Sequence, residues 1–259
     1  MEVKGILFAT LDIPAEYTAE YNRWYDLDHL PEHISKGDVV TARRYVAPRD
    51  LQAAPGAVAG ELTGGHPPYA TIYFFGLEAF DGPEALGFWT TKDRGIVKAG
   101  RYWQQGRGTY SGRWRLAETF TGQGVLVSPA AVPYLAHRGM IVAIGRAPSP
   151  ERREEAVAWW RETQVVDLLA VPGVLAAIRF DPVAGAAGDL TMHVLLCGDD
   201  PADVMPRIEG SRRTLRATGR YPAHGGVYEP LAFLPYRTIV PFEYDFDFGL
   251  QPEGTSVEA

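Results

Sequence analysis

Length, composition and charge place this chain among ordinary globular proteins. It has 259 residues, of which 46% are hydrophobic and 22% charged, and its net charge is −7 with a pI of about 5.4. A chain of this size buries enough surface to fold without disulfides or metals, and it lacks the basic patches that nucleic-acid binding requires. Its first residues contain too short an apolar run for a signal peptide or a membrane span, so we expect a cytoplasmic protein.

The first half of the chain alternates strand and helix patterns. Period-two apolar runs predict strands, and apolar residues spaced three and four apart predict helices. In chain order we expect a strand at 5–11, a helix at 15–30, strands at 39–47 and 69–77, a helix at 83–100 and a strand at 109–121. This order, β-α-β-β-α-β, is that of a ferredoxin-like unit.

The second half predicts the same order of elements. We expect a strand at 139–147, a helix at 150–170, strands at 174–182 and 190–198, a helix at 201–219 and a closing strand at 228–240. The one cysteine of the chain, Cys197, lies in an apolar run and is expected to be a buried, inert thiol.

The two halves are also related in sequence. When the chain is aligned with itself at an offset of 135 positions, Trp24 meets Trp159, Arg44 meets Arg179 and Tyr45 meets Phe180. A second pair of similar segments, AGRY at 99–102 and TGRY at 218–221, has the shorter offset of 119. The shorter offset indicates extra residues in the first copy, and the Gly/Pro/Ala-rich stretch 48–68 is interpreted as that insertion. Such self-similarity is typical of an internal duplication.

We therefore predict an α+β fold of two fused ferredoxin-like repeats. Each repeat has a sheet with helices on one face only, so the bare faces of the two antiparallel sheets should pack face to face. The predicted boundaries are 1–124 for the first repeat, 125–135 for a linker, 136–248 for the second repeat and 249–259 for a disordered tail.

A motif in the first copy carries a family resemblance. Trp24-Tyr25, His29, Pro31 and the later Arg43-Arg44-Tyr45 form the pattern W-Y-x-x-x-H-x-P…R-R-Y. This pattern resembles EthD-like members of the dimeric α/β-barrel superfamily, here as a single-chain pseudo-dimer. The resemblance implies the barrel fold and one of several chemistries: cofactor-free cyclases, dehydratases, lactone isomerases, quinone-forming monooxygenases or, in tandem relatives, haem binding.

The second copy lacks the ionisable residues of this motif. At the offset of 135, Gln164 stands opposite His29, Thr163 opposite Asp28 and Trp160 opposite Tyr25, while packing positions stay apolar. A reactive role can survive in one copy, whereas a structural role is needed in both. The alternative is that these polar residues only form the end of a helix.

The first copy is therefore predicted to hold the catalytic residues. We assign His29 as general acid/base, Asp28 as the group that orients it, and Tyr25 as a hydrogen-bond donor to a developing oxyanion. The predicted substrate-binding residues are Trp24, His33, Arg43, Tyr73, Trp89 and His193. Arg44 and Arg179 recur and are assigned to structural ion pairs, whereas His193 is either a core residue or a polar group in the cavity between the sheets.

The resulting hypothesis is a cofactor-independent lyase or isomerase that acts on a small cyclic or aromatic substrate. Alternatives are a non-catalytic module that sequesters an apolar ligand, and a cofactor-free or haem-dependent oxygenase. His29 and His33 are four residues apart, as in some zinc sites, but Pro31 between them disfavours a regular helix, and no metal is assigned. One of the other histidines, His66, His137, His193 and His224, remains a candidate axial ligand of a haem. A homodimer of such two-copy chains is compatible with the pattern.

Overall fold

The computed structural model describes residues 2–35, 39–76, 97–183, 188–221 and 227–248. Its core is one closed β-barrel of eight strands in the order β1-β3-β2-β8-β5-β7-β6-β4, and every neighbouring pair is antiparallel. The strands are β1 (Gly5–Asp12), β2 (Val39–Val46), β3 (Tyr69–Phe75), β4 (Arg107–Thr121), β5 (Gly139–Arg146), β6 (Val174–Pro182), β7 (Leu190–Cys197) and β8 (Glu229–Thr238).

The prediction of two sheets facing each other is corrected by this closure. The first four strands form one arc, β4-β1-β3-β2, and the last four form another with the same internal order, β8-β5-β7-β6. The arcs join edge to edge through β2 with β8 and through β4 with β6. Closure pairs the edge strands that two separate sheets would leave exposed.

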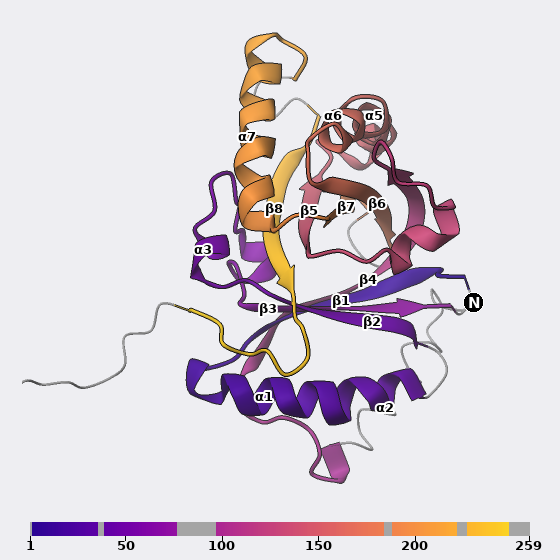
Figure 1. The fold of residues 1–259 in the computed structure, drawn as a ribbon. Coiled ribbons are helices and arrows are strands. Elements are labelled where there is room, and N and C mark those ends of the chain that lie inside the picture. Colours follow the sequence, from indigo (N-terminus) through magenta and orange to yellow (C-terminus); the bar gives the residue numbers. More distant parts are fainter. Residues whose placement is uncertain (1, 36–38, 77–96, 184–187, 222–226, 249–259) are drawn as a thin grey trace, which may run out of the picture.

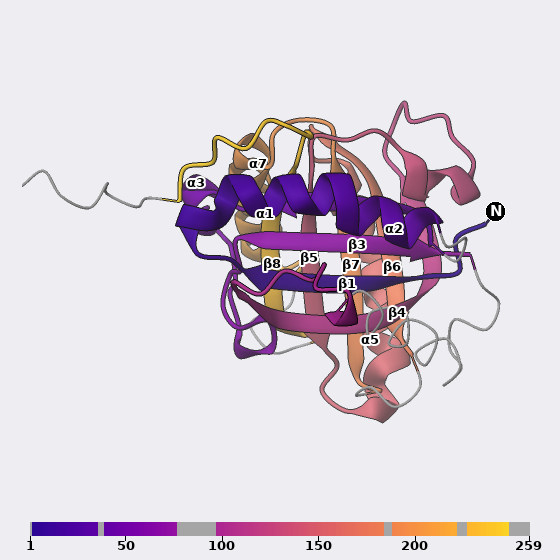
Figure 2. The same ribbon diagram turned by 90° about the horizontal axis from the view of Figure 1, so that it is seen from below.

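Helices cover the outside of the barrel. One rod consists of α1 (Thr18–Trp24), a π-helical turn η2 (Tyr25–His29) and α2 (Leu30–Ser35), and it lies across the outer face of β1 and β3 (Figures 1 and 2). The second rod consists of α5 (Arg153–Trp159), a π turn η7 (Trp160–Gln164) and α6 (Val165–Leu169). The long α7 (Pro201–Ala217) also packs on the second arc, against β8 and β5. No helix of the described ranges is long and apolar enough to cross a bilayer.

The connections carry short helices. The predicted insertion contains α3 (Arg49–Gln52) and the 3₁₀ turn η3 (Glu61–Thr63), and the predicted linker contains a 3₁₀ helix, η5 (Pro129–Tyr134). Two further 3₁₀ turns, η1 (Ala15–Tyr17) and η6 (Pro150–Arg152), lead into the two helical rods. Most of the helix predicted at 83–100, the tail 249–259 and His224 lie outside the described residues.

The alternation of residues along the strands separates two kinds of core. Residues such as Ile6, Phe8, Ile72 and Phe74 fill the barrel interior, which is a continuous apolar core. Their neighbours in sequence point outward and pack under the helical rods, where Tyr73 meets Tyr25. The cysteine prediction is confirmed in that Cys197 is buried, and burial raises the pKa of its thiol.

Candidate functional site

The first helical rod continues through Pro31, contrary to the prediction of a break. Its middle turn is π-helical, because the Leu30 N–H bonds to the Tyr25 carbonyl five residues back. The second rod has the same turn at the aligned position, where the Val165 N–H bonds to the Trp160 carbonyl, and that rod has no proline there. The π turn therefore does not depend on Pro31, which lies directly after it as the second residue of α2.

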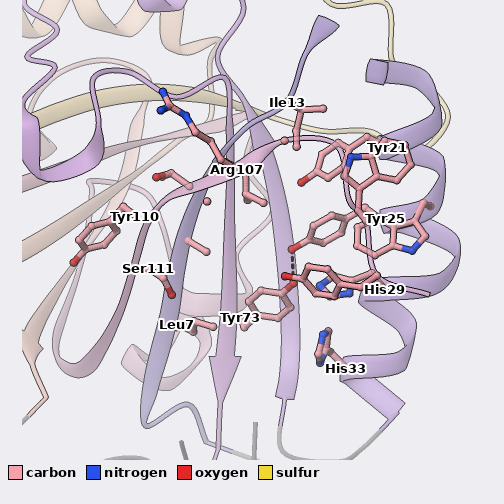
Figure 3. Close-up of a pocket in the computed structure, with 18 residues that line it drawn as sticks. Leu7, Ile13, Tyr21, Tyr25, His29, His33, Tyr73, Arg107, Tyr110 and Ser111 are labelled. Atoms are coloured by element: carbon pink, nitrogen blue, oxygen red, sulfur yellow. Dashed lines mark hydrogen bonds between the residues drawn. The ribbon is translucent and has the colours of Figure 1, made fainter. Parts of the chain in front are cut away.

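This rod and the barrel enclose a cavity of about 230 Å³. The cavity lies outside the barrel, between the rod, the outward faces of β1, β3 and β4, and residues 102–103, so it is not the space between two sheets that the sequence suggested. Figure 3 shows side chains of the rod and of Tyr73 converging on it. Its aromatic and imidazole lining consists of Tyr21, Trp24, Tyr25, His29, His33, Tyr73, Tyr102, Trp103 and Tyr110.

His29 lies in the aromatic wall of the cavity. Its ring stacks on Trp24 with centroids 4.7 Å apart, and it meets the ring edges of Tyr25 at 4.7 Å and of His33 at 4.4 Å. Only 8% of His29 is exposed and 1% of His33. The rings fix the orientation of the His29 imidazole at the cavity wall.

Tyr25 and Tyr73 form a pair of hydrogen-bonded hydroxyls beside this imidazole (Figure 3). Burial raises the pKa of Tyr25 and raises that of Tyr73 further, because the Tyr73 phenol is also close to the Tyr25 phenol. Hydrogen bonds with Thr71 and Tyr73 oppose part of the rise in the Tyr25 pKa, and so does the Arg44 guanidinium, 4.2 Å from the Tyr25 ring centroid. Tyr25 is thus the more acidic phenol of the pair and remains a neutral donor at physiological pH.

Asp28 does not lie in the cavity lining. Its carboxylate pairs with Arg101, whose guanidinium also lies 2.8 Å from Glu32. Consecutive residues of a helix point in different directions, so Asp28 and His29 cannot share one face. The arrangement gives no support for Asp28 as the group that orients His29.

Arg43 is directed away from the cavity. Its guanidinium lies 3.1 Å from Nδ1 of His137 and donates to the Tyr134 carbonyl at 3.0 Å. The recurring arginines behave as predicted, because Arg44 pairs with Asp26 at 2.7 Å and Arg179 pairs with Glu118 at 2.7 Å.

His193 lies on the other arc of the barrel and not with the first-copy residues. Under the second rod it occupies the register position that Thr71 has in the first arc, since Arg179 pairs with His193 as Arg44 pairs with Thr71, and Trp160 stacks on it with ring centroids 4.0 Å apart. Burial and the nearby Arg179 keep its pKa well below the usual range, so it is a neutral core residue. Trp89 lies outside the described residues.

Of the nine predicted site residues, the cavity therefore brings together Trp24, Tyr25, His29, His33 and Tyr73. The lining residues Tyr21 and Tyr102 had not been singled out. Tyr21 lies four residues before Tyr25 and hence on the same helical face, a signal that the sequence contained. Tyr102 is the last residue of the repeated AGRY segment, but no pattern in the sequence places that segment over the rod.

The structure gives no support for a metal site at His29 and His33. Within the parts of the chain that the structure describes, no three His, Cys, Asp or Glu side chains gather as metal ligands do. The two rings meet edge to face at 4.4 Å, which is a packing contact.

A haem also does not fit the described histidines. The cavity at His29 is smaller than the roughly 300 Å³ at which ordinary ligand pockets begin. Trp160 covers His193, His66 Nε2 contacts the Pro235 carbonyl at 3.2 Å, and His137 is bonded to Tyr45.

Comparison with known proteins identifies the fold. No family model matches the chain, and no curated protein matches it in sequence. A solved structure assigned as a chlorite dismutase, TA0507, is similar with a TM-score of 0.52 and 11% identity over 93% of this chain and 96% of the other. A variant of chlorite dismutase from Candidatus Nitrospira defluvii has a TM-score of 0.50 and 9% identity, covering 92% of each chain. The fold is thus of the dimeric α/β-barrel type.

Proposed function

We propose that the protein is a cofactor-independent enzyme, a lyase or isomerase, that moves protons on a small cyclic or aromatic substrate. The observation that carries the proposal is the convergence of His29 and the Tyr25–Tyr73 hydroxyl pair on one aromatic cavity. An imidazole can accept and return a proton near neutral pH, and a buried phenol can donate a hydrogen bond to a developing oxyanion.

In the proposed reaction the His29 imidazole removes a proton from a carbon next to the substrate carbonyl. The electron pair of the broken C–H bond forms the enolate, whose oxygen accepts a hydrogen bond from Tyr25. Tyr73 donates to the Tyr25 oxygen and strengthens it as a donor. Imidazolium then returns the proton to another carbon, which gives an isomer, or to a departing hydroxyl group, which gives water and a dehydrated product.

The aromatic walls support the choice of substrate. Trp24, Trp103 and Tyr102 offer ring faces and edges to a flat ligand, and a cavity of about 230 Å³ holds only a small one. The proposed partner is accordingly a small apolar or aromatic molecule.

We also infer that the chain is an EthD-like tandem pseudo-dimer whose first copy is the active one. Support comes from the identical strand order of the two arcs and from the π turn that recurs at the aligned position. In the second copy Trp160 fills the space over His193, and Gln164 replaces the imidazole.

The same cavity could serve a cofactor-free oxygenase, since a resonance-stabilised carbanion can reduce O₂. That reading shares the first step, removal of a proton by His29, and differs in consuming O₂. A non-catalytic binding module would neither remove a proton from its ligand nor consume O₂. Oxygen uptake with substrate, followed with an oxygen electrode, separates the oxygenase from the isomerase or lyase.

The test uses 2-tetralone, a small aromatic ketone whose acidic C–H bonds exchange with deuterium. Exchange in D₂O, followed by proton NMR, should be faster with the protein than in buffer and should fall about 100-fold or more in His29→Ala. The matched control is Gln164→Ala in the second copy, which should exchange like the wild type. Equal exchange by His29→Ala and the wild type, with both folded by circular dichroism, would rule out the assignment.

A further inference from the structure

Arg44 lies beneath the Tyr25 ring in a position that no part of the reaction above requires. Its guanidinium carbon is 4.2 Å from the Tyr25 ring centroid and 5.4 Å from that of Tyr21. Only 4% of its side chain is exposed. A guanidinium at this distance is attracted to the ring face and acts strongly when it is removed from water.

The guanidinium is fixed from several directions. It donates to Asp26 at 2.7 Å, to the Asn22 carbonyl at 3.3 Å and to the Asn22 side-chain oxygen. The Tyr244 hydroxyl in turn donates to the other oxygen of Asp26 at 2.6 Å. These donors and acceptors leave the guanidinium little freedom to move away from the ring.

Tyr244 belongs to the C-terminal segment, residues 240–248, which runs from β8 to the first rod (Figures 1 and 2). Just before it, the Ile239 N–H donates to the Arg44 carbonyl at 3.0 Å, and within it Phe248 packs on Tyr69. The second half of the chain thereby completes the surroundings of an arginine in the first.

The second copy holds its arginine differently. Arg161 occupies the place of Asp26, and Arg179 is paired with Glu118 of the neighbouring strand and with Asp181. The ion pair of Arg44 with Asp26, supported by the hydrogen bond from Tyr244, therefore has no counterpart at Arg179 in the second copy. It belongs to the half that contains the cavity.

We propose that Arg44 is a positioning residue that fixes the Tyr25 ring and supports its oxygen with a buried positive charge. This inference rests on the proposed function for its catalytic consequence, but the placement of Arg44 stands on its own contacts. As negative charge develops on a substrate oxygen bonded to Tyr25, the nearby cation stabilises it.

The Tyr25 phenol is also hydrogen-bonded by Thr71, which lowers its pKa, and other charged or titratable groups lie around it. They are Tyr21 at 5.5 Å and His29 at 4.7 Å between ring centroids, the Tyr73 hydroxyl, Tyr102, and Asp26 beyond Arg44. Burial raises the Tyr25 pKa and Arg44 opposes that rise. Removal of Arg44 should therefore raise the pKa further, whereas simple loosening of the site would lower it toward the ordinary value of a tyrosine.

The experiment places 3-fluorotyrosine at position 25, where the fluorine reports ionisation of this one phenol by ¹⁹F NMR. Arg44→Met should raise the pKa of that phenol relative to the otherwise unchanged protein. Arg179→Met, the aligned arginine of the second copy, should leave it unchanged. A fall or no change in Arg44→Met, or an equal rise in Arg179→Met, would overturn the inference.

Arg44→Lys keeps the charge but is shorter and cannot hold both partners, so it should raise the pKa less than Arg44→Met does. If Arg44→Met does not fold, Arg44→Lys decides: a rise supports the inference, and no rise overturns it. With unfluorinated protein, turnover of 2-tetralone by Arg44→Lys should fall about fivefold in kcat with KM unchanged. Failure of the proposed function would abolish only this turnover result and leave the fluorine result intact.

Discussion

The protein should lose stability in mildly acidic solution because of His137. This side chain is partly buried between the arcs of the barrel, where Tyr45 Oη lies 2.9 Å from its Nε2 and the Arg43 guanidinium lies 3.1 Å from its Nδ1. Burial lowers the pKa of His137 from 6.5 to about 4, and the Arg43 charge contributes in the same direction.

The sign and size of the effect follow from proton linkage. Above pH 6.5 His137 is neutral in both the folded and the unfolded chain. As the pH falls from 6.5 toward 4, the unfolded chain binds a proton that the folded chain does not, so folding stability falls. Between about pH 7.5 and pH 5 this shift corresponds to a loss of about 2 kcal/mol in the free energy of unfolding.

Urea denaturation at the two pH values measures this loss, and His137→Gln isolates it. The variant should lose about 2 kcal/mol less than the wild type over the same interval. Burial also lowers the pKa of His66 to about 4, but His66 contributes equally to both proteins and cancels in the comparison. Identical losses in the wild type and in His137→Gln would refute the reasoning.

Three further predictions concern stability and are measured by urea or thermal denaturation. Gly139→Ala should lower the free energy of unfolding by more than about 2 kcal/mol, because the added methyl group would lie 2.3 Å from the Tyr236 carbonyl oxygen. In the control Gly210→Ala, in α7, the methyl group meets nothing within 4 Å, so the free energy of unfolding should rise by about 1 kcal/mol. An unchanged stability of Gly139→Ala would contradict this packing. Trp160→Ala should cost about 3–5 kcal/mol, since the ring is 1% exposed, and a loss below about 1 kcal/mol would show that it is not part of a tight core. Pro31→Ala should preserve helix content by circular dichroism and raise stability slightly, because the π turn recurs in the second copy without a proline; loss of helix would show that the proline is needed.

The strands could be predicted from the sequence because local patterns encode them. Every strand expected by alternation is present, with each end within two residues of its expected position. Edge-to-edge closure was not predicted, because pairing between β2 and β8 is a long-range contact that leaves no local signal. The domain boundaries stay a prediction.

The cavity itself could be predicted only in part. Tyr25 and His29 are four residues apart, a spacing that puts two residues on one helical face, and both line the cavity. The position of Tyr73 depends on which face of β3 points outward, and an apolar run on both faces gives no such indication. The roles expected of Asp28 and Arg43 failed to find support because ion pairs and hydrogen bonds with Arg101 and His137 come from segments far away in sequence.

The central claim is that His29 and Tyr25 act together in one proton-transfer step. A double-mutant cycle of His29→Ala and Tyr25→Phe on the deuterium exchange of 2-tetralone tests it most directly. Residues that act as a unit give losses that do not multiply, so the double variant should exchange at about the rate of His29→Ala alone. Losses that multiply, or single variants as active as the wild type, would contradict the claim.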